Sequence, residues 1–406
     1  MKYNLKKEPS KIEFLLPKSK SFRNDRPKIS IVVPALNEEL TIGEFVDWCW
    51  EGLKKAKIKG EIIIVDSSSD NTPNIALTKG AKVLRTPKRG LGQAYIDVIP
   101  FIRGDFIIMG DCDLTYDFRE IKVFIDSYKK GNEFVMGSRF TGSIEDGAMP
   151  PLHRYFGTPL TTWILNRIYH SKYNDIHCGM RGLTKNALVK INLTSKGWEY
   201  ASEMVLKASR IGLQIDEVPV NFYKDRDGRF SHHKRAGFWS PWYAGWINLK
   251  AMLIYSPDSF LIKPGIALLI LGLLILTLAS YGGLSIGPIG LEFHSFLLSM
   301  ASILIGVSFV QMGILARLFH GLRNGIELKI LNNFTYESGM LTFFIFFIIG
   351  LGLETNFVIQ YINNNYELKY FSNTSIAGLA FLILAIQIFS FTLLLELIRR
   401  TKKIAS

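Results

Sequence analysis

Residues 29–39 read ISIVVPALNEE, and they indicate the fold class most clearly. It opens with a β-branched run, Ile29 to Val33, which has the length and composition of a buried strand. Pro34 ends that run, and polar residues follow before an apolar helical pattern begins at Thr41. A strand that leads through a polar turn into a helix is the first unit of an α/β domain.

The same alternation continues outward to about Pro219. Alternation of this kind predicts a parallel sheet covered by helices on both faces. Ligands in such sheets lie beyond the carboxyl ends of the strands, so the polar residues that follow each strand are the site candidates. The further strands are expected at Glu61–Val65, Lys82–Arg85, Asp105–Met109 and Glu133–Met136, and the helices at Thr41–Ala56, Thr72–Lys79, Leu91–Ile102 and Asp117–Lys129.

The second half of the chain is strongly apolar. Each of its apolar stretches has about 18 residues or more, enough to cross a hydrocarbon core of about 30 Å. Charges inside them are rare, and Glu354 and Glu396 lie towards the ends of their stretches. The alternative is the buried helical bundle of a soluble protein. The four expected spans are Pro264–Tyr281, Phe293–Phe319, Gly339–Ile359 and Ser375–Ile398.

Basic residues between the spans predict the orientation. Three lie in 317–329 and four in 399–403, whereas 285–291 has none and 361–373 has only Lys369. The positive-inside bias places the amino-terminal half, the middle loop and the tail in the cytoplasm. Ala236–Phe260 carries three Trp residues and Tyr243 just after Lys234-Arg235, a pattern of an interfacial helix at headgroup level. The alternative is an aromatic core helix.

The composition limits the classes of binding partner and site that are expected. The net charge of +13 favours an anionic partner, and its position beside apolar spans favours lipid over nucleic acid. Three separated cysteines without a CxxC indicate neither a disulfide framework nor a zinc site. Met1 to Arg26 is polar and lysine-rich, without the apolar core of a secretory signal, and is expected to be a loosely ordered tail.

Carboxylates follow two of the expected strands. Asp66 opens the run DSSSDNT, where it could accept hydrogen bonds from a base or a ribose. Asp111 and Asp113 follow the strand that ends at Met109. Two neighbouring carboxylates repel unless a cation lies nearby, and their hard oxygens suit Mg²⁺ or Mn²⁺ shared with substrate phosphates. Alone, such a pair is often only a turn, but its place in this alternation favours a metal site.

Together these motifs resemble the inverting family 2 glycosyltransferases, and most closely their polyprenyl- or dolichol-phosphate glucosyl and mannosyl synthases. The resemblance covers about Ile29 to Lys234. It implies the α/β GT-A fold, a Rossmann-like mixed sheet with helices on both faces, here followed by an all-α four-helix transmembrane domain. The segments are then a polar basic tail (1–28), the catalytic domain (29–235), interfacial juxtamembrane helices (236–262), the transmembrane domain (263–400) and a basic tail (401–406).

The resemblance also implies roles for individual residues. Val65 replaces an Asp that is common in the family, and Thr115 stands where many lipid-phosphate synthases have Gln. The further motifs are GSR at 137–139, DIHCGMR at 175–181, and RDGRFS at 226–231. Implied nucleotide contacts are Pro34, Leu36, Glu38, Asp66, Gly90 and Asp111; metal ligands are Asp111, Asp113 and Thr115; catalytic residues are Asp111, Asp113 and Arg139; and residues that bind the acceptor or the diphosphate are Ser138, Arg139, Arg181, Arg226 and Ser231.

The implied reaction moves a hexose from a nucleotide-diphosphate sugar onto polyprenyl phosphate with inversion. The resemblance favours UDP-glucose over GDP-mannose, at a multi-pass protein of the plasma membrane with its catalytic domain in the cytoplasm. One alternative is a polysaccharide-synthase-like transferase, although its Gln-x-x-Arg-Trp element is missing. Another is a transporter or flippase with a regulatory domain that binds nucleotide sugars, although the spans lack buried charges. Homo-oligomerisation is left open.

Overall fold

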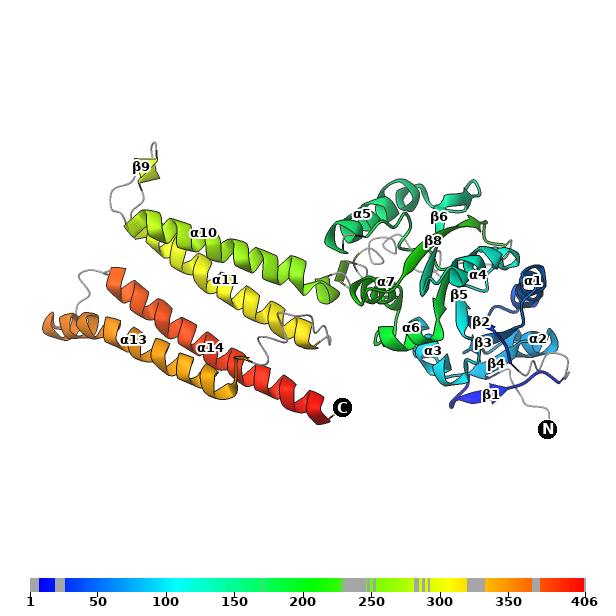
Figure 1. The fold of residues 1–406 in the computed structure, drawn as a ribbon, viewed down its shortest axis with the longest axis horizontal. Helices are drawn as coiled ribbons and strands as arrows, with labels where there is room; N and C mark the ends of the chain where they lie inside the picture. The colour runs from blue at the N-terminus through cyan, green and yellow to red at the C-terminus, as the bar shows by residue number, and fades with distance from the viewer. Residues whose placement is uncertain are drawn as a thin grey trace. The chain divides into compact units, whose positions relative to one another are not determined.

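The protein is described by a computed structural model that covers residues 7–18, 26–169, 171–226, 228, 246, 249–250, 253–280, 285–286, 289–290, 293–319, 333–366 and 373–404. Two compact units are found, Met1–Tyr255 and Ser256–Ser406. Figure 1 shows the first as a sheet with helices and the second as long helices. Most of the expected interfacial segment at 236–262 lies outside the described residues.

The first unit is built on a mixed sheet, which within the described residues has eight strands in the order β1-β4-β3-β2-β5-β7-β6-β8. Strands β4, β3, β2 and β5 are neighbours in the sheet and run parallel to one another. β1 runs antiparallel to β4, and β7 runs antiparallel to both β5 and β6. The strands are β1 (Glu13–Leu15), β2 (Ile29–Ala35), β3 (Gly60–Asp66), β4 (Lys82–Arg85), β5 (Phe106–Met109), β6 (Phe134–Ile144), β7 (Arg181–Thr184) and β8 (Ile215–Phe222).

Helices cover both faces of this sheet. On one face, α1 packs against α2 and α4. On the other face, α7 packs against α3 and α6. The helical segments of this unit are α1 (Ile42–Lys55), α2 (Thr72–Thr78), α3 (Leu91–Val98), η2 (Ile99–Phe101), η3 (Phe118–Glu120), α4 (Lys122–Lys129), η4 (His153–Gly157), α5 (Thr158–Tyr169), α6 (Lys185–Ile191) and α7 (Tyr200–Arg210).

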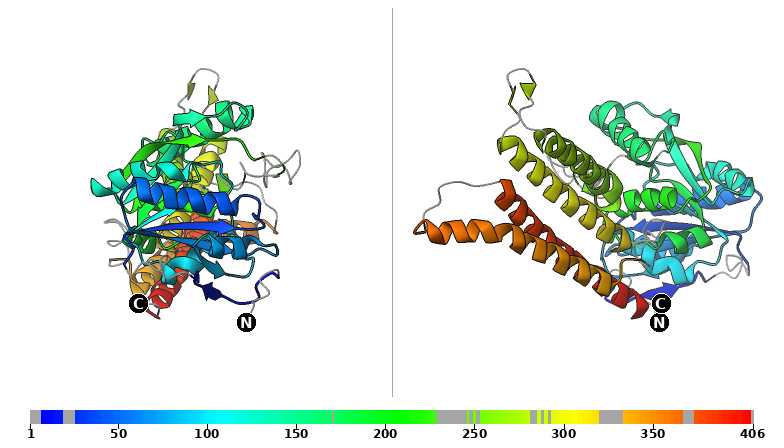
Figure 2. Two further views of the ribbon diagram at one scale, coloured as in Figure 1. Left: turned by 90° about the vertical axis from the view of Figure 1, so that its right-hand side faces the viewer. Right: turned by 60° about the vertical axis from the view of Figure 1, so that its left-hand side comes forward.

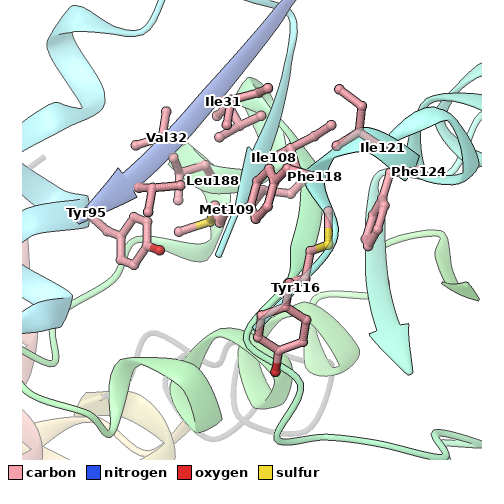
Figure 3. Packing of buried hydrophobic residues seen from close by; sticks show 14 of the residues in the cluster. Ile31, Val32, Tyr95, Ile108, Met109, Tyr116, Phe118, Ile121, Phe124 and Leu188 are labelled. Carbon is pink, nitrogen blue, oxygen red and sulfur yellow. The ribbon is translucent and has the colours of Figure 1, made fainter. Parts of the chain in front are cut away.

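Alternation along the central strands sorts the core into two layers. Ile31 pairs with Ile108 in the β2–β5 register, and both contribute to the layer that contains Phe118. Figure 3 shows Tyr95 and Leu188 on the opposite side of these strands. Successive side chains of a strand point to opposite faces, so a strand buried on both faces needs an unbroken apolar run. The run in 29–33 meets that need.

The sheet differs from the sequence prediction at its antiparallel strands. The parallel strands and their helices lie where the alternation places them, whereas β1, β7 and β8 were not expected as strands. Glu13–Leu15 pairs with β4, so the expectation of a loosely ordered tail is wrong for these residues. The expected fold class, a mixed α/β sheet with helices on both faces followed by a helical unit, is confirmed.

The second unit consists of long apolar helices. Four helices among the described residues are long and apolar enough to cross a membrane, in agreement with the four expected spans. They form two pairs, α10 with α11 and α13 with α14, which lie side by side in Figures 1 and 2. The segments of this unit are η5 (Asp258–Ile262), α10 (Lys263–Ser280), β9 (Ser285–Ile286), β10 (Ile289–Gly290), α11 (Phe293–Phe319), α13 (Tyr336–Asn363) and α14 (Asn373–Ile404).

Small residues bring the paired helices close together. A Cβ at Gly265 would lie 2.9 Å from the carbonyl oxygen of Gly306, and one at Gly306 would lie 2.8 Å from that of Gly265. The backbones of α10 and α11 therefore touch at this level, which is typical of helix pairs in membranes. Between α11 and α14, Gln387 Nε2 donates to Ser308 Oγ over 2.9 Å.

Candidate functional site

The candidate site lies where the parallel strands end. Ala35, Asp66 and Arg85 are neighbours in register across β2, β3 and β4, and β5 ends at Met109 beside β2. The loops after these strands therefore meet at one edge of the sheet. This edge carries most of the residues that the sequence singles out.

The loop after β2 is tied to the loop after β3. The amide of Asn37 donates to Ser68 Oγ over 2.8 Å, and the amide of Glu38 donates to Thr72 Oγ1 over 2.9 Å. Pro34 and Leu36 keep part of their surface accessible, as a base contact requires. Glu38 is only 8% exposed.

Asp66 is completely buried. Its Oδ2 accepts a hydrogen bond from Arg85 Nη1 at 2.7 Å, and its Oδ1 accepts one from the Ser68 amide at 3.3 Å. Burial raises the pKa of this carboxyl, against the opposing effects of Ser68 and Arg85. The structure thus places Asp66 beneath the loop that follows β3, where it orients Ser68, rather than at the surface of the edge.

The glycine-rich turn after β4 has a conformation that requires glycine. Gly90 is exposed and has a φ of +111°, which L-residues rarely adopt. Arg89 Nη2 donates to Asp97 Oδ2 over 2.6 Å, and Gln93 Nε2 donates to Asp97 Oδ1 over 2.8 Å. Asp97 therefore holds the turn and the start of α3 together.

Asp111 and Asp113 follow β5 and are both half-buried. A Cβ at Gly179 would lie 2.6 Å from Asp111 Oδ2, so Gly179 leaves room for that carboxylate. Asp113 Oδ1 accepts hydrogen bonds from the amide (3.0 Å) and the hydroxyl (2.5 Å) of Thr115. Both carboxylates are thus oriented by neighbouring residues.

The donor set fits a divalent cation shared with substrate. Among the described residues no group of three or more His, Cys, Asp or Glu side chains could hold a metal. Two carboxylates at a strand end are what Mg²⁺ or Mn²⁺ needs when phosphates and water supply the other ligands. Asp111 and Asp113 would hold the ion. The Thr115 hydroxyl is used to orient Asp113.

Arg139 forms a buried ion pair in the middle of β6. Its Nε lies 2.6 Å from Asp175 Oδ2 and its Nη2 lies 2.8 Å from Asp175 Oδ1, a bidentate contact. Arg139 is 8% exposed and Asp175 is fully buried. Ser138 has no exposed surface, and its Oγ accepts from the Thr141 amide. Because Nε and Nη2 donate to Asp175, only part of the guanidinium group can donate to another ligand.

The other expected phosphate ligands are placed differently. Arg181 is 1% exposed and donates to the carbonyl oxygens of Cys178 (3.0 Å), Ala201 (2.6 Å) and Ile176 (3.3 Å). Its guanidinium therefore supports the loop before β7. Arg226 is exposed and forms an ion pair with Glu44 on α1. Ser231 lies outside the described residues.

Comparisons with known proteins identify the domain in which these residues lie. Residues 30–191 match the profile of glycosyl transferase family 2. This part of the chain belongs to glycosyl transferase family 2. The family 2 domain includes β2 to β7, with Asp111, Asp113 and Arg139 at the carboxyl edge of its sheet.

Curated relatives are similar to part of this chain. A low-salt glycan biosynthesis hexosyltransferase of Haloferax volcanii is 37% identical over 270 residues, which are 66% of this chain and 63% of that protein. A dolichyl-phosphate hexose transferase of the same organism is 28% identical over 203 residues, which are 49% of this chain and 84% of that protein. The chain spans less than two thirds of the length of the first of these relatives.

Solved structures show a weaker likeness. Glucosyl-3-phosphoglycerate synthase from Mycobacterium tuberculosis, in complex with Mn²⁺ and uridine-diphosphate-glucose, matches 58% of this chain and 81% of its own. The identity is 19% and the TM-score 0.42.

Sequence reasoning missed three residues that shape the family 2 site. Asp175 forms the ion pair with Arg139, and Gly179 leaves room for the Asp111 carboxylate. The Tyr116 hydroxyl accepts a hydrogen bond from the Gly179 amide over 2.9 Å. Asp175 and Gly179 lie in the DIHCGMR element, yet only Arg181 of that element was given a role. Asp175 is 36 positions from Arg139, so no local sequence pattern indicates the ion pair.

Proposed function

We propose that this protein transfers a hexose from a nucleotide-diphosphate sugar to polyprenyl phosphate, with inversion at the anomeric carbon. One observation carries the proposal. The Asp111 and Asp113 pair lies at the carboxyl edge of a family 2 domain, in a chain that also has four helices able to cross a membrane. A soluble acceptor would not require those helices, whereas a lipid phosphate is confined to the bilayer.

The donor is proposed to lie across the carboxyl edge. Pro34 and Leu36 are accessible to the base, and the exposed Gly90 turn can approach the diphosphate closely. Asp111 and Asp113 would hold Mg²⁺ or Mn²⁺, which neutralises the charge that grows on the leaving diphosphate. UDP-glucose is the favoured donor, with GDP-mannose as the other candidate.

The acceptor phosphate is proposed to lie near Arg139. The side of the guanidinium that does not contact Asp175 keeps N–H groups to donate to a phosphate oxygen. A phosphate monoester is already an anion at neutral pH, with a second pKa of about 6. Its oxygen can therefore attack without a strong general base, and a single displacement inverts the configuration.

An exposed apolar surface on the first unit supports a lipid acceptor. Along η4 and α5, large apolar side chains recur at helical spacing and are exposed. They are Leu152, Tyr155, Phe156, Leu160 and Trp163. We propose that these side chains contact the bilayer and that the family 2 domain lies on the cytoplasmic side of the plasma membrane. The proposed segments of the chain are a basic tail (1–28), the catalytic domain (29–235), interfacial helices (236–262), the transmembrane domain (263–400) and a second basic tail (401–406). The relative named as a dolichyl-phosphate hexose transferase supports the same acceptor class.

The test is a donor screen with the full chain in detergent or nanodiscs. Polyprenyl phosphate, Mg²⁺ or Mn²⁺, and radiolabelled UDP-glucose or GDP-mannose are supplied, and label is counted in the lipid extract. Chelation of the metal and Asp113→Asn should each reduce transfer by at least about 100-fold, as expected when a charged ligand is lost. Unchanged rates for that variant would refute the metal assignment. Failure of both donors, with the protein folded, would refute the proposed donors.

A further inference from the structure

Tyr255 is the residue at which the first unit ends, directly before the second unit begins at Ser256. Its hydroxyl lies 3.2 Å from Thr194 Oγ1 and 3.3 Å from Ser195 Oγ. Its carbonyl oxygen accepts a hydrogen bond from Arg210 Nη1 on α7 at 2.9 Å. The last residue of the first unit is thus fixed at both its backbone and its side chain.

Counting protons gives the direction of these hydrogen bonds. The Thr194 hydroxyl has one proton, and it donates that proton to Glu203 Oε1 over 2.8 Å. In its contact with Thr194, Tyr255 can therefore act as the donor, and its hydroxyl also interacts with the Glu203 carboxylate. The Ser195 hydroxyl can then donate to Tyr255. The result is a relay of hydroxyls that ends on the fully buried carboxylate of Glu203.

Glu203 fixes the loop between α6 and α7. Its two oxygens accept the amides of Thr194 at 2.9 Å and Ser195 at 2.8 Å, and Lys207 Nζ lies 2.5 Å away. A buried carboxylate with a cation and several N–H partners is a rigid anchor. Tyr255 adds a further hydrogen bond to that anchor from the chain that leads to the membrane helices.

The backbone of this loop supports the glycine-rich turn. The amide of Gln93 donates to the carbonyl oxygen of Lys196 over 3.1 Å. A Cβ at Gly90 would lie 2.2 Å from that same oxygen, and one at Gly92 would lie 2.1 Å from the carbonyl oxygen of Ser195. There is no space between the loop and the turn, so a shift of the loop must move the turn.

We propose that Tyr255 is a positioning residue for the donor diphosphate, acting through Thr194 and the 194–197 loop on the Gly90 turn. The inference rests on the proposed function, in which this turn contacts the donor. It links donor binding to the chain segment that enters the membrane unit, because that segment supplies the hydroxyl that completes the relay.

The test compares donor kinetics of the full chain with those of Tyr255→Phe, which keeps the ring and removes only the hydroxyl. The KM for the nucleotide sugar should rise about fivefold, the factor that corresponds to one hydrogen bond. The kcat and the KM for polyprenyl phosphate should stay within about twofold, because the variant leaves Asp111 and Asp113 unchanged. A purely structural role would instead lower the active fraction and leave the donor KM unchanged.

Two further variants separate the relay from general packing. Thr194→Val interrupts the relay at its middle, so the double variant with Tyr255→Phe should raise the donor KM no more than either change alone. Tyr173→Phe is the matched control. It removes a hydroxyl contact with Ser209 of the same helix α7, at 3.0 Å and outside the relay, and should leave the donor KM unchanged.

Amide hydrogen exchange gives a readout that needs no substrate. In Tyr255→Phe the amides of residues 90–94 should exchange faster than in the wild type, and those of α4 should not change. If the wild type transfers no sugar, the proposed function is wrong, yet the exchange result still decides whether the relay holds the turn. Unchanged exchange in residues 90–94 together with an unchanged donor KM would overturn the inference.

Discussion

The carboxylate of Asp111 lies against the α-carbon of Gly179, where an added Cβ would stand 2.6 Å from Oδ2. These residues are 68 positions apart, and the contact joins the loop after β5 to the loop before β7. Tyr116 stabilises the contact because its hydroxyl accepts the Gly179 amide at 2.9 Å. The position of the proposed metal ligand is therefore determined by a residue without a side chain.

Gly179→Ala should displace the Asp111 carboxylate and reduce transfer by about 100-fold, the cost of a misplacement of about 1 Å at a reacting centre. The measurement is kcat/KM together with the Mn²⁺ concentration needed for half-maximal rate, which should rise. Gly352→Ala is the control, since a Cβ at that exposed helical position meets nothing within 4 Å. Full activity of Gly179→Ala would mean that Asp111 does not act where the structure places it.

Thr115→Val removes a hydroxyl that donates to Asp113 at 2.5 Å. Since partners that orient metal ligands are typically worth about 10- to 100-fold, transfer should fall by about that factor. Thr115→Ser should restore most of the rate. The check is a series of metal titrations on the three proteins. A loss as large as that of Asp113→Asn would instead favour Thr115 as a direct ligand.

Asp175→Asn should destabilise the first unit by about 3–5 kcal/mol, because it leaves the buried Arg139 guanidinium without its anion. The measurement is the midpoint of denaturant unfolding of the full chain. Lys122→Ala removes the surface partner of Asp126 and should leave the midpoint nearly unchanged. Equal effects of the two changes would contradict a buried, structural ion pair.

Acid should destabilise the protein through His177. Burial lowers the pKa of this imidazole from 6.5 to about 4; Asp175 opposes the shift, and the Arg139 and Arg181 guanidinium groups add to it. The folded state therefore binds fewer protons than the unfolded state between these values. Stability is present above pH 6.5 and is lost as the pH falls towards 4, by at most about 1.4 kcal/mol per pH unit.

His177→Gln should remove this dependence. Unfolding midpoints of the wild type and the variant at pH 7, 6 and 5 provide the measurement, and the gap between wild-type and variant stability should change with pH. Thr161 Oγ1 lies 2.8 Å from His177 Nε2, and Gln retains a group for that contact. Parallel pH profiles would show that the pKa of His177 is the same in the folded and the unfolded protein.

The parts of the fold that were predictable follow from local patterns. An apolar run such as 29–33 must be a strand buried on both faces, and long apolar stretches such as 293–319 have few alternatives to a span. The strands that the sequence did not predict contain residues that are unusual in strands. Pro219 interrupts β8, which is tolerated because β8 is the last strand in the sheet order. β7 has four residues and includes Gly182.

The site was predictable only in part, for a physical reason. The polar residues after each strand follow from the topology, so the sequence predicts Asp111 and Asp113 at this edge of the sheet. Whether an arginine is open to a phosphate depends on partners far along the chain. Arg139 is paired with Asp175, and Arg181 is surrounded by carbonyl oxygens, and neither contact has a local sequence pattern. Such partners become known only from the fold.

The sheet order has a consequence for synthesis. β7 lies between β5 and β6, although it follows both in the chain. When β6 leaves the ribosome it has no neighbour to pair with, since both of its partners, β7 and β8, are still to be made. Arg139 therefore reaches its final place only after residues 181–222 have emerged. The nascent chain holds an unpaired strand during that interval, which is when chaperones would be most needed.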